Sequence, residues 1–201
     1  MNIAIVGATG NVGRKTLEVL EKKGLTLGNL YLVASSKSAG KKIHFQGKDI
    51  IVSELENFDF SKVKIAFFAA GGKISEKFAE KAAKHCLVID NSSFFRMDPD
   101  VPLIVPQVNS DDLNNVKKNI IANPNCSTAQ LVIALKPLHD LFVIKRIVVS
   151  TYQSVSGAGK ASMDELIKQT KLALDGKDIK SENFTKPIAF NAIPHLSLIH
   201  I

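Results

Sequence analysis

Short apolar runs rich in β-branched residues alternate with helical segments over the first 90 residues, and this alternation constrains the fold more than any other feature. The apolar runs are residues 2–6, 30–34, 64–70 and 86–90. Helical periodicity lies between them at residues 12–24 and 75–84. Such alternation is typical of parallel strands joined by crossover helices. The sequence therefore predicts an α/β fold with a doubly wound, Rossmann-like, mostly parallel sheet.

The pattern changes in the second half of the chain. Further expected elements are an edge hairpin at 42–45 and 49–52, a strand at 119–123, a helix at 127–138, a strand at 143–157 and a helix at 161–176. A long strand followed by a helix departs from the earlier alternation. We therefore predict a nucleotide-binding domain over residues 1–126 and the start of an α+β domain over residues 127–201.

Composition narrows the class of protein. Hydrophobic residues make up 45% of the chain and charged residues 22%, as in ordinary soluble globular proteins. The net charge is +7, but the lysines stand in ones and twos, so we expect a solvated surface rather than nucleic-acid binding. Two cysteines and an apolar start without a charged leader favour the cytoplasm. We expect no membrane span and, from the isolated histidines, no zinc site.

A glycine loop, GATGNVG, joins the first predicted strand to the first predicted helix. Gly7, Gly10 and Gly13 allow a tight turn and a close approach to a pyrophosphate, which the helix N-terminus attracts. A tight turn without a ligand is the alternative. The candidate cofactor-binding residues of this loop are Gly7, Thr9, Gly10, Asn11 and Val12.

The turn after the second predicted strand bears on the choice of nucleotide. NAD-binding folds commonly carry an Asp or Glu here for the ribose hydroxyls, whereas this chain has Ser36, Lys37 and Ser38. These side chains can donate hydrogen bonds to a 2′-phosphate. We therefore predict NADP as the cofactor, with a solvated polar loop as the alternative.

Three side chains are candidates for chemistry. Cys126 precedes a predicted helix, whose N-terminus lowers a thiol pKa, so it is either a nucleophile or a packed thiol. Arg96 offers a planar fork for phosphate or is a surface arginine. Gln153 ends a β-branched run, where an amide faces a site or satisfies a buried neighbour. Cys86, at the start of an apolar run, is expected in the core.

Five motifs occur together: GATGNVG, ASSKSAGKK, IDNSSFFRMDPDVPLIVPQVN, NPNCSTAQLV and TYQSVSGAGK. In this order and at these separations they resemble aspartate-semialdehyde dehydrogenases, over nearly all of residues 1–195. The resemblance implies reduction of 4-phospho-L-aspartate by NADPH to aspartate 4-semialdehyde and phosphate, a step toward lysine, methionine and threonine. It also implies that the second domain is a dimerisation and catalytic domain of a homodimer or homotetramer.

The resemblance assigns a role to each matching residue. It implies that Cys126 is the nucleophile and that Gln153 holds the acyl intermediate. It further implies phosphate binding by Arg96 and Asn125, and cofactor contacts by Ser156 and Gly157. The family's acid/base histidine and carboxylate-binding arginine lie downstream of residue 201, and His195 matches neither. We therefore expect this chain to be impaired, with a foreign segment at its SLIHI end.

Two rival functions stay open. An N-acetyl-glutamyl-phosphate reductase uses the same acyl-phosphate chemistry, but typically has glycine where this chain has Asn125. A nucleotide-binding or oligomerisation module without catalysis is the other rival. Cys126 together with Gln153 argues against it.

Overall fold

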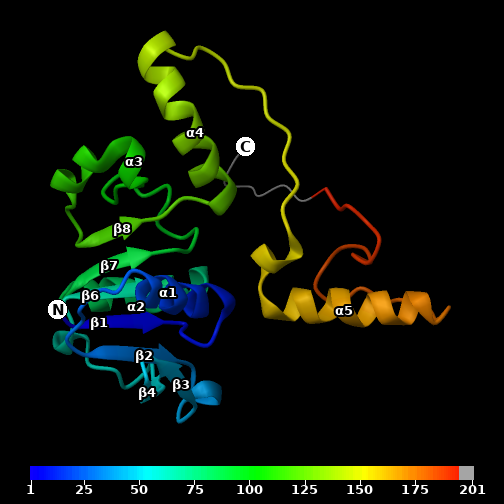
Figure 1. Ribbon diagram of the computed structural model, residues 1–201, viewed down its shortest axis with the longest axis horizontal. Helices are drawn as coiled ribbons and strands as arrows, with labels where there is room; N and C mark the ends of the chain where they lie inside the picture. The colour runs from blue at the N-terminus through cyan, green and yellow to red at the C-terminus, as the bar shows by residue number, and fades with distance from the viewer. Residues whose placement is uncertain (195–201) are drawn as a thin grey trace. The chain divides into compact units, whose positions relative to one another are not determined.

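The computed structural model describes residues 1–194 and divides the chain into two compact units, Met1–Val149 and Ser150–Ile201. Figure 1 labels helices and strands of both units. Within the described residues, no helix is both long and apolar enough to cross a membrane.

The first unit is built on a six-stranded sheet in which every pairing is parallel. Its strands in spatial order are β5 (Ser53–Glu54), β2 (Leu30–Ala34), β1 (Ile3–Val6), β6 (Ile65–Phe68), β7 (Leu87–Asp90) and β8 (Ile120–Ala122). The chain moves outward from β1 in one direction and then, from β6, in the other. This order is that of a doubly wound nucleotide-binding sheet, so the predicted fold class is confirmed.

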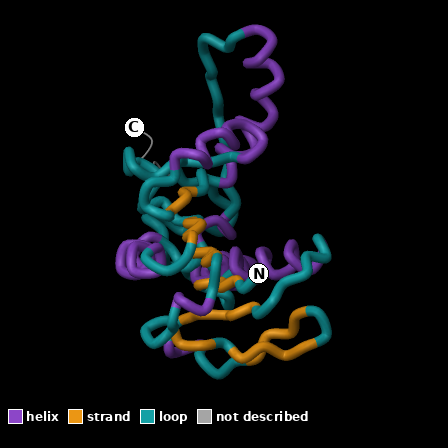
Figure 2. The backbone as a smooth tube through the Cα atoms, turned by 90° about the vertical axis from the view of Figure 1, so that its left-hand side faces the viewer, coloured by secondary structure: helices purple, strands orange, loops and turns teal. Residues whose placement is uncertain are grey.

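The predicted edge hairpin also forms. Strands β3 (Lys42–Phe45) and β4 (Lys48–Ile51) pair antiparallel in a separate two-stranded sheet. Gln46 and Gly47 both have positive φ, the backbone conformation that a two-residue hairpin turn requires. Figure 2 draws the strands of both sheets in orange, and Phe45 of the hairpin packs in one hydrophobic cluster with Leu32 of β2.

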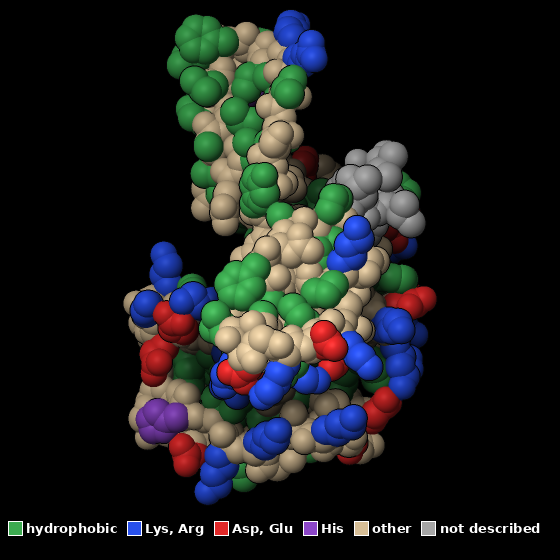
Figure 3. All heavy atoms as spheres, turned by 90° about the vertical axis from the view of Figure 1, so that its right-hand side faces the viewer, with side chains coloured by type: hydrophobic (Ala, Val, Ile, Leu, Met, Phe, Trp, Pro, Cys, Tyr) green, Lys and Arg blue, Asp and Glu red, His purple; other side chains and the backbone are tan. Residues whose placement is uncertain are grey.

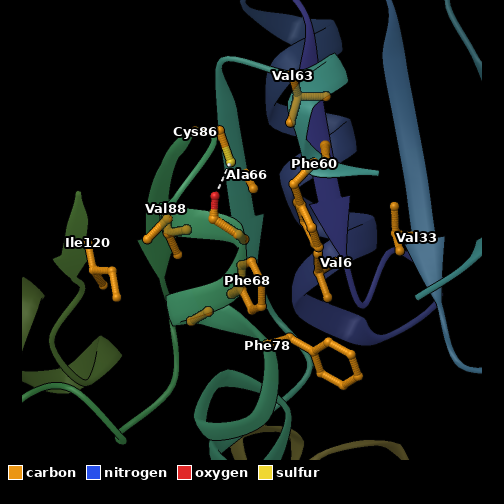
Figure 4. Close-up of a cluster of buried hydrophobic side chains, with 14 of the residues drawn as sticks. Val6, Val33, Phe60, Val63, Ala66, Phe68, Phe78, Cys86, Val88 and Ile120 are labelled. Carbon is orange, nitrogen blue, oxygen red and sulfur yellow. Dashed lines mark hydrogen bonds between the residues drawn. The ribbon is translucent and has the colours of Figure 1, made fainter. Parts of the chain in front are cut away.

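Two helices cover opposite faces of the main sheet. Helix α1 (Asn11–Lys22) places Leu17 and Leu20 in one hydrophobic cluster with Ile5. Helix α2 (Gly72–Ala83) belongs to the other cluster, with Val6 and Phe68 (Figure 4). Because side chains alternate between the faces of a strand, successive residues of β1 reach the two clusters in turn.

Cys86 is a core residue, as the sequence predicts. It is buried in the α2 cluster, and its thiol donates a hydrogen bond of 3.4 Å to the Ala82 carbonyl (Figure 4). Burial raises the pKa of Cys86 to about 11, so this thiol stays protonated and unreactive near neutral pH.

The remaining helices flank the sheet or follow it. In the first unit they are α3 (Pro106–Asn109), α4 (Cys126–Phe142) and three 3-10 turns, η1 (Ser36–Ser38), η2 (Phe60–Lys62) and η3 (Ser110–Asn115). Leu141 and Phe142, at the end of α4, are each 74% exposed. Figure 3 shows hydrophobic side chains scattered over the surface that it draws. On the face that Figure 3 shows, lysines and arginines are interspersed with acidic residues.

The predicted strand over residues 143–157 is wrong. Residues 143–154 have no regular structure, and the 3-10 turn η4 (Val155–Ala158) follows them. Within residues 1–194 no strand pairs with this run, and Val148 is 81% exposed. β-branched residues favour an extended backbone, but a strand also needs the hydrogen bonds of a neighbour.

The second unit is organised by polar contacts from α5 (Lys160–Leu174). Buried Glu165 accepts hydrogen bonds from the amides of Glu182 and Asn183, at 2.8 and 2.7 Å. Gln169, one turn later, accepts from the amides of Ile188 and Ala189. The two side chains therefore hold the segment after α5 against the helix.

Candidate functional site

The first part of the site is the edge of the sheet where β1 and β6 end. Strand order reverses between these two strands, and doubly wound proteins bind ligands at such a point. Gly7 follows β1 with φ +86°, and a Cβ there would lie 2.7 Å from the Ala69 carbonyl oxygen. A Cβ on Gly13 would lie 2.3 Å from the Gly7 carbonyl oxygen. Both glycines are therefore required for the loop to pack against its neighbours.

Two helices, α1 and α2, begin at this edge. Among the described residues, no side chain caps the N-terminus of α1, which follows Gly10, or of α2, which follows Gly71. The first amides of a helix and its dipole together attract phosphate groups. Asn11 and Val12 form the exposed start of α1, so the predicted loop residues are brought together.

The predicted nucleotide-selecting turn lies beside the glycine loop. Ser36, Lys37 and Ser38 form η1 directly after β2, with Ser36 and Lys37 exposed. The Thr9 hydroxyl donates a 3.4 Å hydrogen bond to the Ser38 hydroxyl, which links the two segments. The glycine loop and the start of α1 therefore offer backbone amides, and the neighbouring η1 offers hydroxyls and a lysine.

Cys126 is the first residue of α4, as predicted. It is exposed, and the adjacent Asn125 caps the helix by accepting a 3.0 Å hydrogen bond from the Ser127 amide. The Asn125 amide oxygen also lies 4.0 Å from the Cys126 sulfur. The thiol therefore lies exposed at the start of a 17-residue helix.

Arg96 braces the backbone that leads to this cysteine. Its Nε donates a 2.9 Å hydrogen bond to the Asn123 carbonyl, and its Nη2 donates a longer one of 3.4 Å to the Asn91 carbonyl. Burial lowers the pKa of the Arg96 guanidinium below its ordinary value, whereas the negative charges of Asp90 and Cys126 oppose the shift. A half-buried cation therefore lies within electrostatic reach of the thiol.

The sequence analysis did not single out Asp90, a buried side chain just before the turn that carries Arg96. Asp90 is fully buried at the end of β7 and accepts hydrogen bonds from the Ser75 hydroxyl at 2.6 Å and the Ser92 hydroxyl at 2.7 Å. The Ser92 amide donates a third, at 3.1 Å. A carboxylate closing an otherwise apolar strand was the signal in the sequence, since aspartate is rarely buried without partners.

The second unit brings together its own predicted residues. Gln153, Ser156 and Gly157 lie in and just before η4, and all three are exposed. A Cβ on Gly157 would lie 2.5 Å from the Gln153 side-chain nitrogen, so glycine leaves room for that amide. Gln153 does not end a strand, since none forms here. The roles of these three residues stay predictions.

Within residues 1–194, no three or more His, Cys, Asp or Glu side chains cluster in a way that could hold a metal ion. His195 and the SLIHI segment lie outside the described residues.

Comparison with known families gives the site its context. Residues 2–116 match the family model "Semialdehyde dehydrogenase, NAD binding domain", and residues 135–198 match "Semialdehyde dehydrogenase, dimerisation domain". The chain belongs to the semialdehyde dehydrogenase family. The first match covers the glycine loop, η1 and Arg96, and the second begins within α4.

Named semialdehyde dehydrogenases resemble the chain throughout its length. It is 52% identical over 200 residues to an aspartate-semialdehyde dehydrogenase of Aquifex aeolicus, covering 98% of this chain and 59% of that protein. It is 50% identical to the Vibrio cholerae aspartate semialdehyde dehydrogenase II whose structure was solved complexed with ASA. That match has a TM-score of 0.90 and covers 97% of this chain and 59% of that one.

One family structure at lower sequence identity was solved with a cofactor. The aspartate semialdehyde dehydrogenase of Candida albicans, solved with NADP, is 30% identical with a TM-score of 0.59, covering 71% of this chain and 48% of that one. The chain thus spans less than two thirds of the length of each of these semialdehyde dehydrogenases.

Proposed function

We propose that the protein catalyses the NADP-dependent reductive dephosphorylation of 4-phospho-L-aspartate to L-aspartate 4-semialdehyde. The observation that carries the proposal is Cys126, exposed at the start of α4 beside its cap Asn125 and within reach of the Arg96 cation. Identity of about half to named aspartate-semialdehyde dehydrogenases supports the choice of substrate. Among acyl phosphates, Asn125 favours the aspartyl compound over the N-acetyl-glutamyl one.

The proposed chemistry begins at the Cys126 sulfur. The thiolate attacks the acyl carbon of the acyl phosphate, a carbon–sulfur bond forms, and the carbon–oxygen bond to phosphate breaks. Phosphate leaves with that electron pair, and the Arg96 fork together with the Asn125 amide neutralises and orients it. Amides at the start of α4 are suited to stabilise the oxyanion of the addition step. Gln153 is proposed to hold the resulting acyl group.

The reduction needs NADPH, which when bound would supply the hydride that takes the thioester carbon to the aldehyde level; the carbon–sulfur bond then breaks and the Cys126 thiolate is released. The glycine loop fits this group, since Gly7 and Gly13 bring backbone amides to an edge that no side chain of residues 1–194 caps. Lys37 and its flanking serines are proposed to bind the 2′-phosphate. Ser156 and Gly157 are proposed to contact the cofactor, as the resemblance implies. The NADP named for the Candida relative supports this choice.

Further proposals concern the whole protein. We assign residues 1–126 to NADP binding and residues 127–201 to the catalytic and dimerisation domain. The match of residues 135–198 to a dimerisation domain supports a homodimer or homotetramer. Two unpaired cysteines support a cytoplasmic site of action in lysine, methionine and threonine synthesis.

Mass spectrometry of the full-length protein mixed with 4-phospho-L-aspartate, without cofactor, tests the proposal. We expect an aspartyl adduct on the peptide containing Cys126 and release of an equal amount of phosphate. Cys126→Ala should abolish both, whereas Cys86→Ala should retain them because that thiol is buried and protonated. An adduct formed only with N-acetyl-glutamyl phosphate would assign the rival reductase. No adduct with either compound, on a thiol that iodoacetamide still labels, would refute the proposal.

A further inference from the structure

A buried carboxylate lies between the two parts of the candidate site in the first unit. Asp90 and Ser75 are both completely buried, and Ser92 is 7% exposed. Ser75 belongs to the first turn of α2, at the sheet edge where β1 and β6 end. Ser92 begins the turn that leads to Arg96. A single side chain therefore joins the start of α2 to the turn over residues 91–96.

The hydrogen bonds of Asp90 engage both of its side-chain oxygens. Oδ1 accepts from the Ser75 hydroxyl and the Ser92 amide, and Oδ2 accepts from the Ser92 hydroxyl. Buried polar atoms are costly unless they are hydrogen-bonded, and these three donors meet that need.

Contacts continue from this carboxylate to the arginine. The Ser92 hydroxyl accepts a 3.1 Å hydrogen bond from the Phe94 amide, and the Arg96 amide closes the turn onto the Ser93 carbonyl at 3.4 Å. The Asn123 amide donates to the Asp90 carbonyl at 2.8 Å, and Arg96 Nε donates to the Asn123 carbonyl. Asp90 thus contacts both segments that the arginine bridges.

We propose that Asp90, with Ser75 and Ser92, is a positioning residue that holds the Arg96 guanidinium on the Asn123 carbonyl, in the segment that leads to Cys126, and ties its position to the start of α2. The importance of this position for phosphate rests on the proposed function, but the position itself does not. Without the carboxylate, Ser75 and Ser92 lose their shared acceptor and the turn over residues 91–96 is released.

Alkylation of Cys126 by two reagents of similar size tests the position of the cation. Iodoacetate is an anion and iodoacetamide is neutral, so the ratio of their rates reports the positive charge beside the thiol. A charge pair a few ångströms apart in a wet site contributes ~1 kcal/mol, which is about a fivefold change in rate. The rates are read on the Cys126 peptide of the whole chain, and protection of buried Cys86 reports folding.

We expect the ratio of the iodoacetate rate to the iodoacetamide rate to fall about fivefold in Arg96→Leu, which corresponds to the loss of a charge interaction of ~1 kcal/mol. It should fall in the same direction, at least twofold, in Ser75→Ala, Ser92→Ala and Asp90→Asn. Ser93→Ala is the matched control, since no described residue hydrogen-bonds to its hydroxyl, and it should leave the ratio unchanged.

Three results would overturn the proposal. One is an unchanged ratio in folded Ser75→Ala and Ser92→Ala, and another is an equal change in both rates, which would report thiol burial alone. The third is unfolding of Ser75→Ala, Ser92→Ala and Asp90→Asn alike, which would mean that Asp90 contributes only to stability. The test is separate from that of the proposed function, because a thioester can fail to form while the ratio still responds to Arg96.

Discussion

Replacing Gly13 by alanine should destabilise the first unit, although alanine is the better helix former. Gly13 lies in the first turn of α1, and Gly72 begins α2, so the same substitution can be made at two helix starts. The surroundings differ. A Cβ on Gly13 meets backbone, whereas a Cβ on Gly72 meets only the Ser93 and Phe94 side chains in ordinary contact.

The distances set the magnitudes. Alanine in place of glycine stabilises a helix interior by up to ~1 kcal/mol, and less at its first residue. At Gly13 the new Cβ would lie 2.3 Å from the Gly7 carbonyl oxygen and 2.8 Å from the Ala8 Cα, so α1 must move away from β1. Overpacking of this kind costs about 3 kcal/mol at its upper range. We expect a net loss of about 2 kcal/mol for Gly13→Ala and a gain of ~0.5 kcal/mol for Gly72→Ala.

Cys86 provides the assay, because its buried thiol becomes accessible only when the first unit opens. Pulse labelling of Cys86 in a urea series, read by mass spectrometry, gives the unfolding midpoint of that unit alone. With a slope of ~2 kcal/mol per molar urea, Gly13→Ala should lower the midpoint by about 1 M. Gly72→Ala should raise it slightly.

A Gly13→Ala midpoint equal to or above that of the unmodified chain would refute the packing argument. Equal destabilisation by Gly72→Ala would refute it too, since that position has room for a methyl group.

Two further predictions concern charge. Hydrogen bonds, led by that from the Glu182 amide, lower the pKa of Glu165 below its ordinary value of 4.5. Its contribution to the stability of the second unit is therefore complete above that value and is lost as pH falls through the lowered pKa. The urea midpoint of α5, followed by its amide NMR signals, should fall on acidification in the unmodified chain and much less in Glu165→Gln; parallel curves would contradict this. Lys37→Ala should weaken NADPH binding about tenfold in a fluorescence titration and spare NADH, since a charge-assisted hydrogen bond contributes ~1.5 kcal/mol. Lys41→Ala is its control, and equal loss of both cofactors would count against a 2′-phosphate contact.

Most of the first unit could be predicted from the sequence because its signals are local. Apolar β-branched runs, a glycine loop and helical periodicity each depend on a few neighbouring residues, and all point to the same fold. The prediction of a strand over residues 143–157 was wrong because strand formation is not a local property. These residues favour an extended backbone, but strand formation depends on a pairing partner that the run itself does not contain.

In the candidate site, too, the features that depend on neighbouring residues were predictable and those that depend on distant contacts were not. The place of Cys126 at a helix start follows from the sequence near it, and so does the lack of an acidic residue in η1. Asp90 was overlooked because its partners Ser75 and Ser92 lie on different elements, and Ser75 is far from it along the chain. The cap that Asn125 forms could have been anticipated, whereas the brace from Arg96 to the Asn123 carbonyl could not.

The sequence by itself determined the alternation of strands and helices over the first 90 residues, the glycine loop and the residue types available for acyl-phosphate chemistry. These depend on backbone preferences and periodicity, which act over a few residues. Only the tertiary structure decided that α1 and α2 cover opposite faces, that Arg96 reaches the segment leading to Cys126, and that a buried carboxylate supports it. Those features depend on burial and hydrogen bonding between residues far apart in the chain, and such contacts exist only once the sheet has formed.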